Sequence, residues 1–184
     1  MNLFPQAQDH LLRAERKLQR KGPYLHSVAL TVLVMAAYFL GYGLDEVVPT
    51  HVTAAVIGAL WSAVTVLAVF KDEWTETWHS FWSTLASGLL GGVVAILYLL
   101  YLPQKMLALA VVMVVALLSS QLLGFQDRGR QVVSTVLLIV IFSHLNRSPP
   151  WLNVGMRLAE VLIGSMVGLL GGWLLRNAGV LEEE

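Results

Sequence analysis

Six long apolar stretches dominate the sequence and leave few folds open to it. They are Leu25–Gly43, His51–Phe70, Trp82–Tyr101, Met106–Gly124, Gln131–Asn146 and Leu158–Leu175. A helix needs about 20 apolar residues to cross the hydrocarbon core of a bilayer, where its backbone must satisfy its own hydrogen bonds. Strands of a membrane barrel would instead show shorter segments of alternating polarity. The sequence therefore predicts an all-α integral membrane protein with about six transmembrane helices.

The basic residues between these stretches predict the orientation of the chain. If the N-terminus is cytoplasmic, nine Lys and Arg residues lie inside: Arg13, Arg16, Lys17, Arg20, Lys21, Lys71, Arg128, Arg130 and Arg176. Three lie outside, namely Lys105, Arg147 and Arg157. Cytoplasmic loops carry the excess of basic residues in multi-pass proteins. We therefore expect both termini in the cytoplasm.

The remaining segments divide the chain into three parts. Residues 1–24 are expected to hold a cytoplasmic amphipathic helix, residues 25–176 the six-helix transmembrane domain, and residues 177–184 a short cytoplasmic tail. Trp74, Trp78 and Trp82 recur at helical spacing ahead of the third stretch. Such a stripe is typical of the membrane–water interface, and stacking on a substrate is the alternative.

Composition excludes several function classes. The net charge is zero and the chain has no cysteine, so we expect no nucleic-acid partner and no thiolate metal site. No nucleotide-binding, nucleophile-elbow or zinc-protease motif occurs. The sequence predicts no catalytic residues, no metal and no cofactor.

Small residues recur every three to four positions in three of the stretches. They include Gly58 in the second, Ser87, Gly88 and Gly91 in the third, and Gly164, Gly168 and Gly172 in the sixth. Small residues at this spacing allow helix backbones to approach closely in lipid, so we expect these positions to pack helices. Glycine is also simply common in membrane helices, which is the alternative explanation.

Residues Gly88–Gly92 and Gly168–Gly172 both read Gly-Leu-Leu-Gly-Gly, 80 positions apart. A duplication of three plus three helices would place the halves in opposite orientations, as in many transporters. The match of five residues makes this inverted repeat a possibility and not a demonstration.

Arg157 and Glu160 begin the sixth stretch, on the same helical face as its glycines. Charged side chains in a membrane helix are expensive and often functional. One interpretation is that Arg157 attracts an anion and Glu160 holds it or takes up a proton. The other is an ion pair within the helix that makes its end easier to insert.

Residues 50–176 resemble the FUSC superfamily, which includes bacterial aromatic acid exporters and plant aluminium-activated malate transporters. The resemblance rests on Trp61–Thr65, on Ser83–Gly88, on the stretch ending at Gly124, and most specifically on Arg157, Glu160 and Gly164 in the family's Arg-x-x-Glu-x-x-x-Gly pattern. Ser80 stands where the family usually has Arg, and Ser83 where it usually has Gly.

The resemblance implies a six-helix module of the bacterial-type inner (plasma) membrane that pairs with another copy and moves organic anions. We therefore expect a transporter of small organic, possibly aromatic, anions that works as a homo-oligomer, with a dimer favoured. The candidate substrate-binding residues are Arg157, Glu160, Trp61, Thr65 and Thr84. The alternative is an accessory membrane subunit that binds a protein or lipid and transports nothing, which the scarcity of intramembrane charge favours. A lipid-modifying enzyme is a remote third option.

Overall fold

A computed structural model describes residues 22–47, 52–124, 128–145 and 149–178. Within these ranges the chain forms six α-helices and no strand, which confirms the all-α membrane fold. The helices are α2 (Gly22–Val47), α3 (Val52–Val69), α4 (Trp74–Tyr101), α5 (Met106–Leu122), α6 (Gly129–Leu145) and α7 (Pro150–Asn177). The expected N-terminal amphipathic helix lies outside the described residues, as does most of the C-terminal tail.

Two helices begin well before the apolar stretches that predicted them. α4 begins at Trp74 instead of Trp82, and α7 at Pro150 instead of Leu158. Proline is favoured in the first turn of a helix, because its missing N–H is not needed there. Hydropathy marks only the apolar part of a helix, so it misses polar turns that are sheltered by neighbouring helices.

The early start of α7 corrects one sequence expectation. Arg157 does not lie in an outer loop but two turns inside α7, and only 3% of its surface is exposed. Its charge therefore does not count among the outer basic residues, which leaves Lys105 and Arg147. The predicted bias toward a cytoplasmic N-terminus becomes nine against two.

The helices fall into two length classes. α2, α4 and α7 are long and apolar enough to cross a bilayer, whereas α3, α5 and α6 have 18, 17 and 17 residues. At 1.5 Å per residue the shorter helices reach about 26 Å, slightly less than the roughly 30 Å hydrocarbon core.

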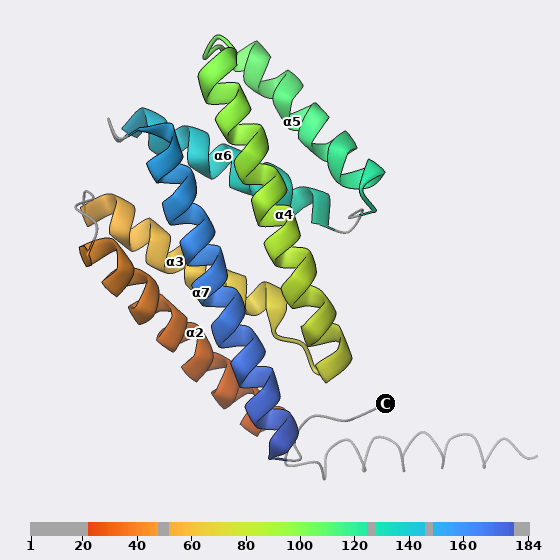
Figure 1. Cartoon of the computed structure of the whole chain (residues 1–184). Helices are drawn as coiled ribbons and strands as arrows, with labels where there is room; N and C mark the ends of the chain where they lie inside the picture. Colours follow the sequence, from red (N-terminus) through yellow and green to blue (C-terminus); the bar gives the residue numbers. More distant parts are fainter. Residues whose placement is uncertain (1–21, 48–51, 125–127, 146–148, 179–184) are drawn as a thin grey trace, which may run out of the picture.

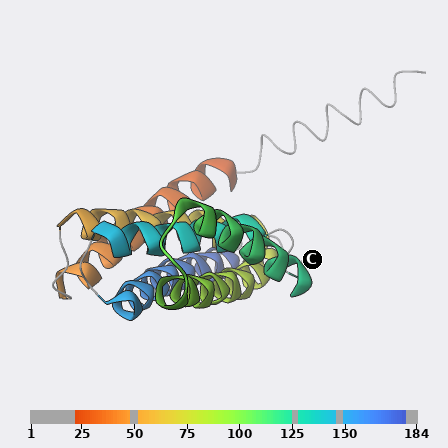
Figure 2. The ribbon, with the colours of Figure 1, turned by 90° about the horizontal axis from the view of Figure 1, so that it is seen from above.

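The helices are arranged in two layers with two flanking helices. α4 and α7 form one layer, and α3 and α6 lie behind them in the other (Figure 1; Figure 2). α2 flanks the α3 side and α5 flanks the α6 side (Figure 1). α7 packs mainly on α2, α3 and α4, while α4 packs mainly on α6 and α7. Each half of the chain has therefore exchanged its third helix: α7 completes the bundle of α2 and α3, and α4 that of α5 and α6.

The two exchanged contacts have the same atomic plan. A Cβ at Gly164 would overlap the Ser62 carbonyl oxygen and lie 2.7 Å from Thr65 Cβ, so α7 and α3 touch backbone to backbone. A Cβ at Gly91 would lie 2.9 Å from the Val132 carbonyl oxygen and 2.8 Å from Thr135 Cβ, so α4 and α6 do the same. In each case a glycine of one helix contacts a backbone carbonyl of the other helix, together with the threonine that follows that carbonyl by three residues.

A two-fold relation between the halves follows from these contacts. Gly91 and Gly164 are 73 positions apart, and so are Gly88 and Val161, which contact each other where α4 crosses α7. Residues that are equivalent and also in contact mark the axis of such a relation. α4 and α7 run antiparallel at this crossing, because Gly92 faces Val154 and Gly172 faces Thr77.

The two Gly-Leu-Leu-Gly-Gly segments do not follow this register. They are 80 positions apart, which is seven residues more than the spacing of the structural equivalents. Seven residues are close to two helical turns, so the shift keeps the same face of the helix. The structure thus has an inverted repeat, but the Gly-Leu-Leu-Gly-Gly segments are not its equivalent positions.

Candidate functional site

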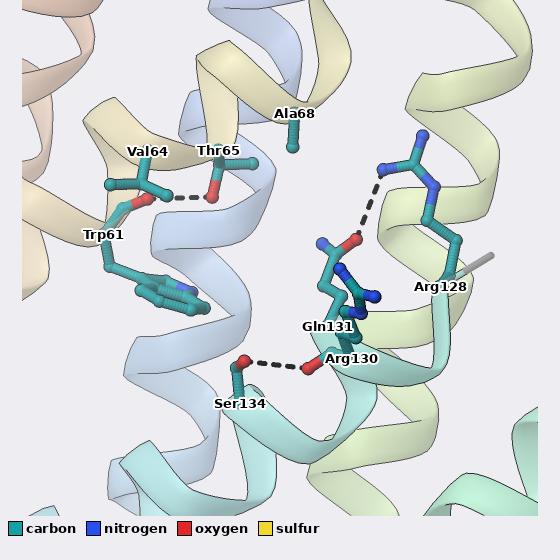
Figure 3. Close-up of a pocket in the computed structure, with 8 residues that line it drawn as sticks. All are labelled: Trp61, Val64, Thr65, Ala68, Arg128, Arg130, Gln131 and Ser134. Atoms are coloured by element: carbon teal, nitrogen blue, oxygen red, sulfur yellow. Dashed lines mark hydrogen bonds between the residues drawn. The ribbon is translucent and has the colours of Figure 1, made fainter.

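A cavity of about 270 Å³ lies between α3 and α6. The described parts of these two helices make no extensive contact with each other, because α3 packs on α2 and α7 whereas α6 packs mainly on α4. Eight residues line the cavity: Trp61, Val64, Thr65 and Ala68 from α3, and Arg128, Arg130, Gln131 and Ser134 at the start of α6 (Figure 3). α7 passes behind the space between them (Figure 3).

The α6 side of the cavity is basic and polar. Arg128 reaches toward α4, where Nη2 donates to Ser80 Oγ at 2.9 Å and Nη1 lies 3.3 Å from Thr84 Oγ1. Nη1 also lies 3.5 Å from Gln131 Oε1, which orients the Gln131 amide (Figure 3). Arg130, in contrast, is exposed. The cavity thus has one guanidinium held against the wall and one at its rim.

The α3 side is aromatic and apolar. The indole of Trp61 points from α3 into the space toward α6, and Val64 and Ala68 lie along the same helix face (Figure 3). The Thr65 hydroxyl donates to the Trp61 carbonyl at 2.8 Å, which satisfies it within the helix. An indole can stack on a planar or apolar group while guanidinium groups bind an anionic end.

Arg157 and Glu160 form a separate, closed cluster on α7. Arg157 Nη1 lies 2.5 Å from Glu160 Oε2, and the two side chains are 4% and 0% exposed. The Arg157 guanidinium stacks over the Phe142 ring of α6, with its carbon 4.1 Å from the ring centre. Ser62 of α3 donates its hydroxyl to the Glu160 carbonyl at 3.2 Å. This pair faces the interior between the two layers and does not line the cavity.

The structure brings only some of the predicted substrate residues together. Trp61 and Thr65 line the cavity, Thr84 lies behind it against Arg128, and Arg157 and Glu160 lie apart in their ion pair. None of these positions tests binding, so the roles assigned to them stay predictions.

The small residues expected to pack helices lie at helix contacts or in buried positions. Gly164 and Gly168 face α3, Gly172 faces the first turns of α4, and Gly91 faces α6. Gly88 faces Val161 on α7, whereas Gly58 and Ser87 are buried in α3 and α4.

Sequence reasoning missed the basic wall of the cavity. Arg128, Arg130 and Gln131 were read as a cytoplasmic loop and the edge of a span, where basic residues serve topology. The structure places the Arg128 guanidinium against Ser80 of α4, a residue that the chain separates from it by 48 positions.

Comparisons with known proteins agree with the resemblance seen in the sequence. A family model described as fusaric acid resistance protein-like matches residues 58–171, which is more than half of the chain. No curated protein and no solved structure matches the chain.

Proposed function

The chain belongs to the fusaric acid resistance protein-like family, and we propose that it carries small organic anions across a membrane by way of the cavity between α3 and α6. Members of this family are associated with membrane transport and resistance, which supports a transporter in general. The finer proposal, an organic anion with an aromatic or apolar body, is supported by the lining of the cavity. The family name itself refers to resistance to an organic acid.

The observation that carries the proposal is the meeting of Arg128, Arg130 and Trp61 at one small cavity. Guanidinium groups recognise carboxylates and related anions through paired, charge-assisted hydrogen bonds. The volume of about 270 Å³ is near the lower limit of ligand pockets, which fits a small solute. Arg130 is better placed to bind an anion than Arg128, because Arg128 already donates to α4.

We further propose that the working unit is a homodimer in the inner (plasma) membrane with both termini in the cytoplasm. The cavity would then open toward the cytoplasmic half, since Arg128 and Arg130 lie at the predicted cytoplasmic end of α6. The dimer is supported by the small size of the module and by the pairing that the family resemblance implies.

The test is binding of benzenesulfonate, an aromatic anion that stays ionised, to the purified protein in nanodiscs by calorimetry. Replacing Arg130 with Gln should weaken binding about tenfold or more, because a hydrogen bond to a charged group contributes roughly 1.5–3 kcal/mol. Lys105→Gln is the matched control, since it removes an exposed positive charge from the α4–α5 connection and should leave affinity unchanged.

Two results would contradict the proposal. Equal loss of affinity in both variants would show that binding depends on overall charge and not on the cavity. Absence of both binding and flux for any organic anion in folded protein would favour the accessory-subunit alternative.

A further inference from the structure

The two-fold relation brings one arginine guanidinium to the equivalent place in each half, fully buried in one half and half-buried in the other. Arg157 lies seven residues before Gly164 on α7, and Thr84 lies seven residues before its equivalent, Gly91, on α4. Thr84 therefore occupies the place of Arg157 in the first half. The Arg128 guanidinium reaches that place from α6, since Nη1 lies 3.3 Å from Thr84 Oγ1.

The two arginines differ in the side chain that the repeat places beside them. Arg157 is paired with Glu160, which is fully buried. The position equivalent to Glu160 in the first half is Ser87, which is also fully buried and donates its hydroxyl to the Thr84 carbonyl at 3.0 Å. A carboxylate thus stands in one half where the other has a neutral hydroxyl.

The Glu160 carboxylate occupies the place that a carboxylate ligand would take on Arg157. A second anion cannot join the intact pair, because it would add an uncompensated negative charge to a site out of contact with water. An anion can therefore bind Arg157 only if it displaces Glu160, and the displaced carboxylate must lose its charge.

We propose that Glu160 is an internal competitor of the transported anion, and that the anion binds Arg157 only when Glu160 takes up a proton from the aqueous phase. This inference rests on the proposed function. The step balances in charge: the Arg157–Glu160 pair becomes an Arg157–anion pair beside neutral Glu160. One proton therefore enters the site with each monovalent anion, and the buried site stays neutral throughout.

The proposed step depends on the Glu160 carboxylate, so the groups that surround this side chain matter. Three neighbouring helices contribute neutral groups to this pair: Ser62 from α3, Phe142 from α6, and Gly41 of α2, which packs on Ser62. On the α4 side the neighbouring Val161 meets Gly88. The other charged or titratable side chains described on these helices are Glu76, His79, Tyr98 and Tyr101 on α4, Arg130 and His144 on α6, Arg176 on α7, and Tyr24, His26, Tyr38 and Tyr42 on α2. Arg128, just before α6, contacts Ser80 and Thr84 of α4. The described part of α3 contains no charged residue.

The experiment measures uptake of radiolabelled benzenesulfonate into proteoliposomes across a range of external pH. This sulfonate does not cross lipid as a neutral acid, so pH dependence must come from the protein. Wild-type uptake should rise several-fold when the side holding the anion is acidified from pH 8 to pH 6. Glu160→Gln carries a permanently neutral group, so its uptake should be independent of pH and, at pH 8, several-fold above wild type. Glu76→Gln, an exposed carboxylate on α4, should keep the wild-type response.

A double variant keeps the test decisive if the single variant does not fold. Arg157→Gln with Glu160→Gln removes both charges, leaving no buried ion without its partner. It should lose at least tenfold in uptake while cavity binding of benzenesulfonate stays within twofold of wild type. A wild-type pH response in either variant would overturn the gating proposal while leaving the transporter intact. Absence of binding and uptake in the wild type would instead overturn the proposed function.

Discussion

Gly164 is the residue on which the contact between α7 and α3 depends. A methyl group there would overlap the Ser62 carbonyl oxygen, and backbone atoms cannot move aside as a flexible side chain can. Overpacking of this kind costs about 1–3 kcal/mol. We therefore expect Gly164→Ala to lower the thermal midpoint of the protein in detergent.

The control for this prediction lies nine residues earlier on the same helix. A Cβ at Gly155 would meet no atom within 4 Å. Gly155→Ala should be neutral or stabilise α7 by up to about 1 kcal/mol, because alanine is the better helix former. Equal thermal midpoints for the two variants would show that α7 and α3 do not approach as closely as the structure indicates.

For single residues, the sequence predicted which side chains stand out better than it predicted which side chains they contact. Arg157 and Glu160 are recognisable as a pair from their spacing of three on one helix. The contacts of Arg128 with Ser80 and Thr84 join segments that are more than 40 residues apart, so local spacing does not predict them. A contact between distant helices depends on tertiary packing, which a single sequence does not display.

At the scale of the elements, the antiparallel crossing of α4 and α7 is open to direct test. A Cβ at Gly92 would lie 3.2 Å from Val154 Cγ1, close enough for a disulfide between cysteines introduced at the two positions. The chain has no cysteine of its own, so the background is zero. We expect Gly92→Cys with Val154→Cys to cross-link on mild oxidation, detected as a mobility shift reversed by reductant.

Cysteines displaced by one residue on both helices provide the matched control. Val93 and Gly155 are exposed and point away from the crossing, so Val93→Cys with Gly155→Cys should stay reduced under the same conditions. Cross-linking of the control alone would place the helices in a different rotational register.

The number of helices could be predicted from the sequence, but their ends could not. Apolar length identified all six, since lipid-facing turns must be apolar. The first two turns of α4 and α7 were missed because they carry residues such as Glu76 and Asn153, which lower local hydropathy. These turns are stabilised by helix propensity and by neighbouring helices, and hydropathy reports neither.

At the scale of the whole molecule, orientation is the property that remains a prediction. With nine basic residues on the predicted inner side, a fluorescent protein that folds only in the cytoplasm should be bright when fused after Glu184. Alkaline phosphatase, which is active only outside the cytoplasm of bacteria, should be active when inserted at Pro103. The opposite pattern of activities would invert the topology and place the cavity in the outer half.

The inverted repeat shows how much a short repeated sequence can predict about structural symmetry. Gly-Leu-Leu-Gly-Gly pointed to a duplication of three helices, and the packing has that symmetry. The two Gly-Leu-Leu-Gly-Gly segments are nevertheless shifted by about two helical turns relative to the equivalent contacts at Gly91 and Gly164. Glycine-rich faces tolerate such a shift, since the same face is presented after seven residues. Only the contacts themselves fix the true correspondence.

The exchange of the third helix also determines when the protein becomes stable during synthesis. α3 packs on α2 once both helices are made, but its contact with α7 forms only when α7 emerges, after roughly 80–110 further residues. At a synthesis rate of about 5–20 residues per second, α3 therefore lacks its α7 contact for roughly 5–20 seconds. Throughout that interval the α7 backbone at Gly164, which meets the Ser62 carbonyl and Thr65, is missing from the bundle. The nascent chain is therefore most open to degradation just before its last helix inserts, and truncation anywhere before α7 removes the partner that the first half needs.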